Sequence, residues 1–249
     1  MEQFVYDQFN ELENKHWWFC GRRAYLRKII HDSFENKSSS LSFCEIGSGT
    51  GGNLSLLAEY SQVDSVEMND QARKMIEEKS IKGVRNVYPG HLPDNMCHSD
   101  EYDGVFSLDV IEHIEDDAAA LLEIKDYIKN DGLFISTVPA YQWLWSAHDV
   151  ANFHHRRYTK TTYCELIDRA GYDIIYSSYF NTLLFPLAAI SRLVEKLIKR
   201  DTDSDAAALT MPNKLINSIL FKIFSIESWW AGKVSIPFGL SVVVVAKKK

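Results

Sequence analysis

The chain has 249 residues, 46% of them hydrophobic and 24% charged, which suits one large globular domain or one domain with an appendage. The formal net charge of -7 argues against a broad phosphate-binding surface, so we expect no nucleic-acid partner. The four cysteines form no CxxC pair and no zinc-ligand spacing. They indicate isolated thiols in a reducing, cytoplasmic setting, and we expect no metal site.

In chain order, residues 1–35 are expected to be helical, and the polar residues 36–40 form a linker. From residue 41 onward, short β-rich runs alternate with helical runs, which predicts a parallel sheet with crossover helices. The expected strands are Leu41–Ile46, Ser61–Glu67, Val84–Tyr88, Tyr102–Leu108, Gly132–Val138, Tyr172–Phe180 and Leu240–Lys247. The expected helices are Gly52–Tyr60, Asp70–Lys79, Asp116–Lys129 and Thr161–Ala170.

Residues 181–238, between the sixth and seventh strands, depart from this alternation. Two helical stretches, Leu183–Lys199 and Pro212–Trp230, flank a polar linker, Asp201–Thr210. Their apolar faces favour packing against each other and against the sheet. The alternative is peripheral contact of residues 183–230 with a membrane surface, since basic residues stand beside the apolar ones. The longest apolar-rich run is too polar to span a bilayer.

The strongest local signal is a glycine-rich loop between the first strand and the helix that follows it. Gly47, Gly49 and Gly51 allow positive φ angles and let a ligand approach the backbone closely. The helix N-terminus faces the same ligand. Glu67 ends the next strand, where an acid can accept both hydroxyls of a ribose. The sequence therefore predicts a nucleoside-binding site.

A nicotinamide-dependent oxidoreductase is the first alternative, because Gly47, Gly49 and Gly52 also fit G-x-G-x-x-G. Glu45 argues against it, since a carboxylate two residues before Gly47 would repel a pyrophosphate. A ligand that carries an ammonium and a sulfonium would instead be attracted. The chain also lacks a second mononucleotide-binding half.

These motifs resemble those of class I S-adenosylmethionine-dependent methyltransferases. The run from Glu45 to Gly51 resembles motif I, and Glu67 matches the acid at the end of strand two. Residues 90–93 resemble the loop that flanks the adenine, and residues 108–114 resemble the segment after strand four. The resemblance implies an α/β, Rossmann-like seven-stranded sheet of order 3-2-1-4-5-7-6, with strand seven antiparallel.

The predicted elements and the resemblance, which covers the core, together divide the chain into three expected parts. An N-terminal helical lid covers residues 1–40, and the methyltransferase core covers residues 41–180 and 239–249. The helical insertion covers residues 181–238. We expect S-adenosylmethionine as the cofactor, bound by the glycine loop, the strand ends and the lid through Glu45, Gly47, Ser48, Gly49, Gly51, Glu67, Met68, His91, Leu92, Leu108, Asp109, Trp17 and Arg22.

More specific strings resemble bacterial methyltransferases that are often associated with cell-surface polysaccharide synthesis. They are residues 16–23, residues 143–149 and residues 154–159, rich in His, Trp, Arg and Tyr. This likeness implies an acceptor hydroxyl or terminal phosphate on a surface-glycan precursor of the O-antigen kind. We expect a cytoplasmic protein, with peripheral contact of residues 183–230 with the inner face of the membrane as the alternative.

Methyl transfer to a hydroxyl needs a base that takes the proton, and histidine suits this task near neutral pH. The candidate catalytic residues lie in loops at the carboxyl edge of the sheet: His113, His148, Asp149 and His154. Aromatic rings stack on sugars and arginine clamps phosphate, so the candidate acceptor-binding residues are Trp143, Trp145, Arg157 and Tyr158.

Two further alternatives stay open beside the oxidoreductase. One is a methyltransferase that acts on a small hydroxylated metabolite such as a quinone or a phenol. The other is a non-catalytic partner that binds S-adenosylmethionine within a glycan-assembly complex.

Overall fold

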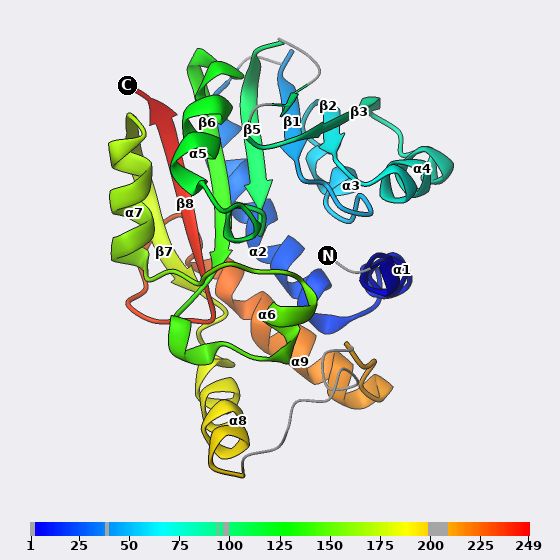
Figure 1. Ribbon diagram of the computed structural model, residues 1–249, viewed down its shortest axis with the longest axis vertical. Helices are drawn as coiled ribbons and strands as arrows, with labels where there is room; N and C mark the ends of the chain where they lie inside the picture. Colours follow the sequence, from blue (N-terminus) through cyan, green and yellow to red (C-terminus); the bar gives the residue numbers. More distant parts are fainter. Residues whose placement is uncertain (1–2, 38–39, 94, 97–99, 199–208) are drawn as a thin grey trace.

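The computed structural model describes residues 3–37, 40–93, 95–96, 100–198 and 209–249 (Figure 1). One sheet runs through the molecule in the strand order β4-β3-β2-β1-β5-β6-β8-β7. The strands are β1 Ser42–Ile46, β2 Gln62–Glu67, β3 Val84–His91, β4 Asn95–Met96, β5 Tyr102–Leu108, β6 Ile128–Pro139, β7 Tyr172–Phe180 and β8 Ser241–Lys248.

The predicted topology is confirmed. Strands β3, β2, β1, β5 and β6 pair in parallel, and β8 pairs antiparallel with both β6 and β7. Without the short β4, this is the order 3-2-1-4-5-7-6 with the last strand antiparallel. β4 was not expected: it pairs antiparallel with the end of β3, Gly90 opposite Met96, so residues predicted as loop continue the strand to His91.

Helices cover the two faces of the sheet. On one face, α2 (Trp17–Phe34), α3 (Leu54–Leu57) and α9 (Lys214–Ile226) share a core with strand residues such as Phe43 and Phe106. On the other face, α5 (Asp117–Asp126) and α7 (Lys160–Arg169) pack on Cys44 and Val105. Figure 1 shows α5 and α7 on the near side of the strands and α2 behind them.

The N-terminal segment forms two helices, not the one helical stretch expected. α1 (Gln3–Leu12) ends before residues 13–16, and α2 begins after His16, whose side chain accepts a hydrogen bond from the Trp18 amide at 3.3 Å. Tyr25, Leu26 and Ile29 of α2 are fully buried under the sheet. The second half of α2 is therefore part of the core, and only its first turns and α1 reach the carboxyl edge.

Two predicted helices, over residues 52–60 and 116–129, and the predicted strand over residues 132–138 need correction at their ends. The helix expected over Gly52–Tyr60 shortens to the single turn α3, because glycines precede it and the Asn53 side chain binds Glu45 instead of capping the helix. α5 ends at Asp126, and β6 already begins at Ile128, where Tyr102 pairs with it. α4 (Asp70–Lys79) matches its prediction, with Asn69 as the N-cap.

The helical segment between β7 and β8 lies where it was expected. α8 (Phe185–Ile198) projects beyond the ends of the strands in Figure 1, and α9 runs along α2. The end of the first predicted stretch, Lys199, and most of the expected linker, residues 201–208, lie outside the described residues. Among the helices described, none combines the length and the apolar character that crossing a membrane requires.

Candidate active site

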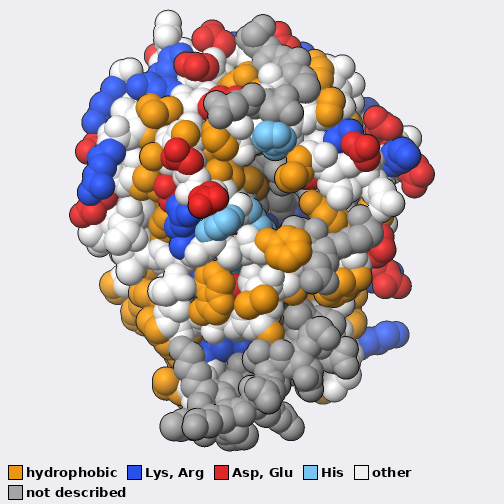
Figure 2. All heavy atoms as spheres, in the orientation of Figure 1, with side chains coloured by type: hydrophobic (Ala, Val, Ile, Leu, Met, Phe, Trp, Pro, Cys, Tyr) orange, Lys and Arg blue, Asp and Glu red, His pale blue; other side chains and the backbone are white. Residues whose placement is uncertain are grey.

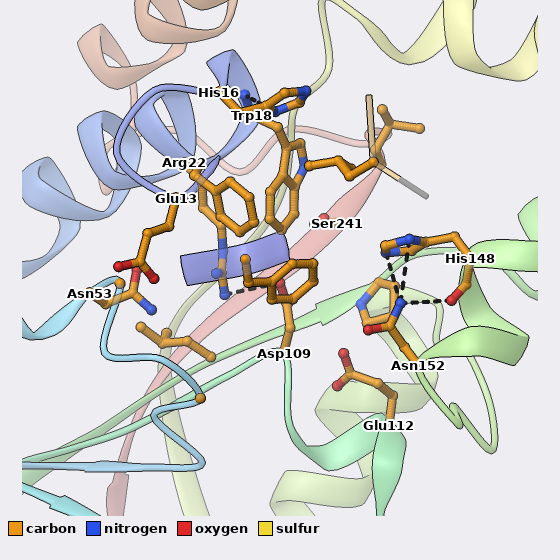
Figure 3. A pocket seen from close by; sticks show the side chains of 18 of the residues that line it. Glu13, His16, Trp18, Arg22, Asn53, Asp109, Glu112, His148, Asn152 and Ser241 are labelled. Atoms are coloured by element: carbon orange, nitrogen blue, oxygen red, sulfur yellow. Dashed lines mark hydrogen bonds and ion pairs between the residues drawn. The ribbon is translucent and has the colours of Figure 1, made fainter. Parts of the chain in front are cut away.

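A cavity of about 600 Å³ opens at the carboxyl ends of β1, β5 and β6. This edge is the switch point of the sheet, where chain order reverses between β1 and β5 and where open α/β folds bind ligands. In Figure 2 the hollow lies in the middle of the visible face, with histidine and apolar side chains around it. Figure 3 shows α2 side chains entering from one side and Glu112 and His148 from the other.

The glycine loop has the backbone geometry that its sequence predicts. Gly47, Gly49 and Gly51 have φ angles of 74°, 55° and 86°, which side chains with a Cβ rarely adopt. A Cβ on Gly47 would come within 2.6 Å of Val110, whereas a Cβ on Gly49 would meet nothing within 4 Å. The backbone at Gly49 therefore faces open space, as a cradle for a ligand should.

Glu45 lies buried beneath this loop, with 1% of its surface exposed. One carboxylate oxygen accepts a hydrogen bond from Asn53 Nδ2 at 2.9 Å, and the other has no hydrogen-bond partner among the described residues. Burial raises the pKa of Glu45 to about 7, partly offset by Asn53 and the charge of Arg22. A buried carboxylate with a spare oxygen is suited to a cationic ligand.

Glu67 ends β2 beside the loop. Its oxygens accept hydrogen bonds from the amides of Gly49 at 2.7 Å and Asn69 at 2.9 Å, and Tyr6 Oη of α1 lies 3.5 Å away. The pKa of Glu67 is raised, mainly by burial. Because a carboxylate offers about four acceptor positions, Glu67 can also take ribose hydroxyls.

The N-terminal segment contacts the glycine loop through Glu13. The Thr50 hydroxyl donates to one Glu13 oxygen at 2.6 Å, and Lys79 Nζ contacts the other at 2.5 Å. Arg23 donates to the Gly52 carbonyl oxygen at 3.2 Å. These contacts hold the segment after α1 against the loop.

Arg22 of α2 points into the cavity and connects α2 with the sheet. Its Nη2 lies 2.9 Å from Asp109 Oδ2 and donates to Thr137 Oγ1 at 2.9 Å, and Thr137 in turn donates to Asp109. Asp109 has a positive φ of 59°, a strained conformation typical of functional sites. The guanidinium stacks 5.4 Å from the Trp18 ring, so the two side chains form one wall.

Histidines line the opposite half of the cavity. The rings of His113 and His154 meet edge to face with centroids 4.5 Å apart, and Glu112 lies beside them. Burial, followed by the neighbouring His154, lowers the pKa of His113 to about 3. His148 also lines the cavity, next to Asn152 Nδ2. Glu112 is fully buried, and burial together with Asp109 raises its pKa well above the usual value.

Asp149 links several residues of this half of the cavity through its buried carboxylate. Its carboxylate accepts from Arg157 Nε at 2.7 Å, Arg157 Nη2 at 2.8 Å and the Ser146 amide at 2.9 Å, and it binds His154 Nδ1 at 2.9 Å. Burial opposes ionisation, but His154 and Arg157 prevail and hold the pKa of Asp149 well below its usual value. Asp149 therefore has the geometry of a residue that positions His154.

Many of the expected site residues line one cavity. They are Trp17, Arg22, Gly47, Ser48, Gly49, Leu108, Asp109, His113, His148, His154 and Arg157. Glu45, Gly51, Glu67 and Asp149 are not in the lining, but the three carboxylates bind residues that are: Asn53 for Glu45, Gly49 for Glu67 and His154 for Asp149. The structure does not bring the others to it: Met68, His91, Leu92, Trp143, Trp145 and Tyr158 lie outside the lining. Tyr158 donates to Asp117 at 2.7 Å, and Trp143 packs on Phe185.

Sequence reasoning missed several lining residues. They are Tyr6, Glu13, Asn53, Glu112, Asn152, Arg192 and Ser241. Glu112 had a signal, its place beside His113 directly after β5. Asn53 also had a signal, because it directly follows the glycine loop, whereas the rest come from segments whose approach to the cavity depends on tertiary packing. Three cysteines, Cys20, Cys44 and Cys164, are free thiols, and Cys97 lies outside the described residues.

The fold is that of an α/β protein with a candidate nucleoside-binding cavity at the carboxyl edge of its sheet. The sequence model of the family described as "Methyltransferase domain" matches residues 20–177, more than half of the chain. The chain belongs to this family and is an S-adenosylmethionine-dependent methyltransferase. No curated protein matches it significantly.

Solved structures support the fold at low sequence identity. Coclaurine N-methyltransferase bound to N-methylheliamine and SAH is similar at 16% identity and a TM-score of 0.58, covering 91% of this chain and 70% of that one. Phosphoethanolamine N-methyltransferase 2 of Haemonchus contortus in complex with S-adenosyl-L-methionine has 16% identity and a TM-score of 0.57, over 97% and 59%. The [4+2]-cyclase SpnF has 12% identity and a TM-score of 0.56, over 90% and 81%.

Proposed function

We propose that the chain transfers a methyl group from S-adenosylmethionine to a hydroxyl or terminal phosphate of a surface-glycan precursor. The observation that carries this proposal is the continuity of the cavity, which joins the glycine loop to His113, His148 and His154. The likeness of the His-, Trp- and Arg-rich strings to polysaccharide-associated methyltransferases supports the glycan acceptor.

The glycine loop, Glu45 and Glu67 fit the donor. The open backbone at Gly49 gives room for it, the spare oxygen of Glu45 suits its positive charge, and Glu67 suits its ribose. When bound, the donor supplies a methyl group already activated by the sulfonium. Trp18 and Leu144 line the cavity and reduce the access of water to the reacting groups.

The half of the cavity that is lined by His113, His148 and His154, here called the histidine half, receives the acceptor. A hydroxyl that attacks the methyl group must lose its proton, and His113, His148 and His154 lie within the same half of the cavity to take it. Arg192 also lines the cavity, and its guanidinium favours a phosphorylated acceptor. Asp149 fixes the orientation of His154 and does not itself face the acceptor.

An exposed apolar face on α8 supports contact with a membrane surface. Leu187, Ile190, Leu193 and Val194 are 45–63% exposed, although the sequence favoured packing of this face against other elements. Arg192 stands on the same helix and also lines the cavity. A helix of this kind would bring a lipid-linked acceptor to the histidine half.

A labelled-methyl assay over a panel of acceptors tests the proposal. The panel holds a lipid-linked saccharide, the same saccharide without lipid, a sugar phosphate, and a quinol and a phenol. We expect turnover with the saccharides and faster turnover with the lipid-linked one. Turnover with the quinol or phenol alone would contradict the glycan acceptor, and binding of the donor without turnover on any acceptor would favour a non-catalytic partner.

A further inference from the structure

Glu112, His113 and His154 form a compact cluster at the acceptor end of the cavity. One ligand atom from each lies within 4.8 Å of the others, and all three residues line the cavity. Glu112 and His113 come from the turn after β5, and His154 comes from the loop after α6 (Ala147–Ala151). Two imidazoles and one carboxylate are a common ligand set for a divalent transition metal.

The carboxylate of Glu112 is an independent sign that something is bound there. The residue is fully buried, and neither oxygen has a hydrogen-bond partner among the described residues. The two nearby arginines are engaged elsewhere, since Arg157 binds Asp149 and Arg22 binds Asp109. A buried carboxylate is costly unless a cation or hydrogen-bond donors compensate it.

His154 already has the outer contact that metal-bound histidines usually show. Its Nδ1 is held by Asp149 Oδ1 at 2.9 Å, which fixes the ring and leaves Nε2 for another partner. Asp149 is itself fixed by Arg157 and Ser146. A carboxylate behind the histidine orients the ring and makes its second nitrogen a better ligand.

We propose that Glu112, His113 and His154 bind one divalent transition-metal ion, of the Zn²⁺, Co²⁺ or Fe²⁺ type. Three protein ligands leave coordination positions open toward the cavity. The role of the ion rests on the proposed function: it holds the acceptor oxygen and lowers the pKa of its hydroxyl. The O–H bond then breaks with the proton passing to His148, and the new O–C bond forms as the C–S bond of the donor breaks.

Cobalt binding to the full, untagged chain tests this site. Protein treated with EDTA and desalted is titrated with Co²⁺, and calorimetry is read together with visible absorption. A second cluster, His31, Asp32 and Glu35, lies on the surface and can bind metal on its own, so every protein carries His31→Ala. We expect one equivalent of Co²⁺ with absorption bands of an imidazole–carboxylate site.

Glu112→Gln and His154→Gln should each weaken Co²⁺ binding at least about tenfold. The matched control is His155→Gln, which alters the exposed neighbour of His154 and should leave Co²⁺ binding unchanged. Affinity for S-adenosylhomocysteine is measured on each variant as a test of folding. Two results would overturn the metal site, provided that the protein still binds S-adenosylhomocysteine. One is a parent protein that binds no Co²⁺, and the other is Co²⁺ binding that is equally strong in the parent and in Glu112→Gln and His154→Gln. If the parent protein, which carries only His31→Ala, does not bind S-adenosylhomocysteine, that result would instead contradict the proposed methyltransferase function.

Discussion

At the scale of single residues, the site depends on buried charges that are only partly compensated. Glu45 and Glu112 each keep at least one buried oxygen without a described partner, whereas Asp149 and Glu67 are well provided with donors. Incomplete compensation lowers the stability of the empty protein, and a bound cation would restore it. Such local costs are usual where a fold carries a function.

The raised pKa of Glu45 predicts a pH dependence of stability. Its pKa is about 7 in the folded chain and 4.5 for the free side chain, so the folded state holds the extra proton between these values. Stability of the empty protein therefore falls as pH rises from about 4.5 to 7. Glu45→Gln should raise the free energy of unfolding at pH 8 by about 1–3 kcal/mol.

Urea unfolding at pH 8 and pH 5 measures this effect. The gain of Glu45→Gln should shrink strongly at pH 5, where Glu45 is protonated in the folded wild-type chain. Glu59→Gln is the control, because that carboxylate pairs with Arg27 on the surface. Equal gains for Glu45→Gln at both pH values would show that the buried charge is not the cause.

The glycine loop and the acid that we propose to bind the donor could be recognised in the sequence because their spacing is local. Gly47, Gly49 and Gly51 belong to one loop, and Glu67 follows at the end of the next strand. The contacts of Glu13 with Thr50 and of Arg22 with Asp109 join residues far apart in the chain. No periodicity or spacing indicates such pairs, since the packing of α2 on the sheet brings them together.

At the scale of elements, α2 packs closely against α9 at Gly21. An added Cβ on Gly21 would lie 2.5 Å from Phe224 Cδ1, and Phe224 is fully buried. Gly21→Ala should therefore destabilise the protein by about 1–3 kcal/mol from overpacking, although alanine favours the helix itself. A helix glycine with space around it would give the opposite sign.

Chemical denaturation with a double-mutant cycle checks this explanation. Phe224→Leu makes room for the new methyl group, so Gly21→Ala should cost less in that background. A cost that does not change between the two backgrounds would locate the strain elsewhere. The sequence did not indicate this contact, because it predicted the N-terminal helix as a lid and α9 as part of an insertion, not as partners.

The exposed apolar face of α8 leads to a second prediction for an element. The double variant Leu187→Glu and Ile190→Glu should reduce flotation with anionic liposomes, because two charges replace the exposed apolar side chains. Leu122→Glu, on an exposed position of α5, is the matched control and should float like wild type. Wild-type protein that does not float with anionic vesicles would remove the membrane role.

At the scale of the whole molecule, the alternation of strands and helices predicted a parallel sheet with crossover helices, and the resemblance to class I methyltransferases supplied the strand order and the antiparallel last strand. The hydrophobic runs of β1, β5, β6 and β8 are buried on both faces, and such runs leave few alternatives. The proximity of Glu112 and His154 could not be predicted from the sequence, since Glu112 follows β5 and His154 follows α6. Only the folded edge of the sheet places them in one cavity.

We expect Glu45, Glu67 and the glycine loop to bind S-adenosylmethionine, and calorimetric titration of the full chain with this cofactor tests the expectation directly. One equivalent should bind, and Glu67→Ala should lose about 10–100-fold in affinity, as expected for hydrogen bonds to a charged group. Absence of binding to the wild-type protein, or an unchanged affinity in Glu67→Ala, would contradict it.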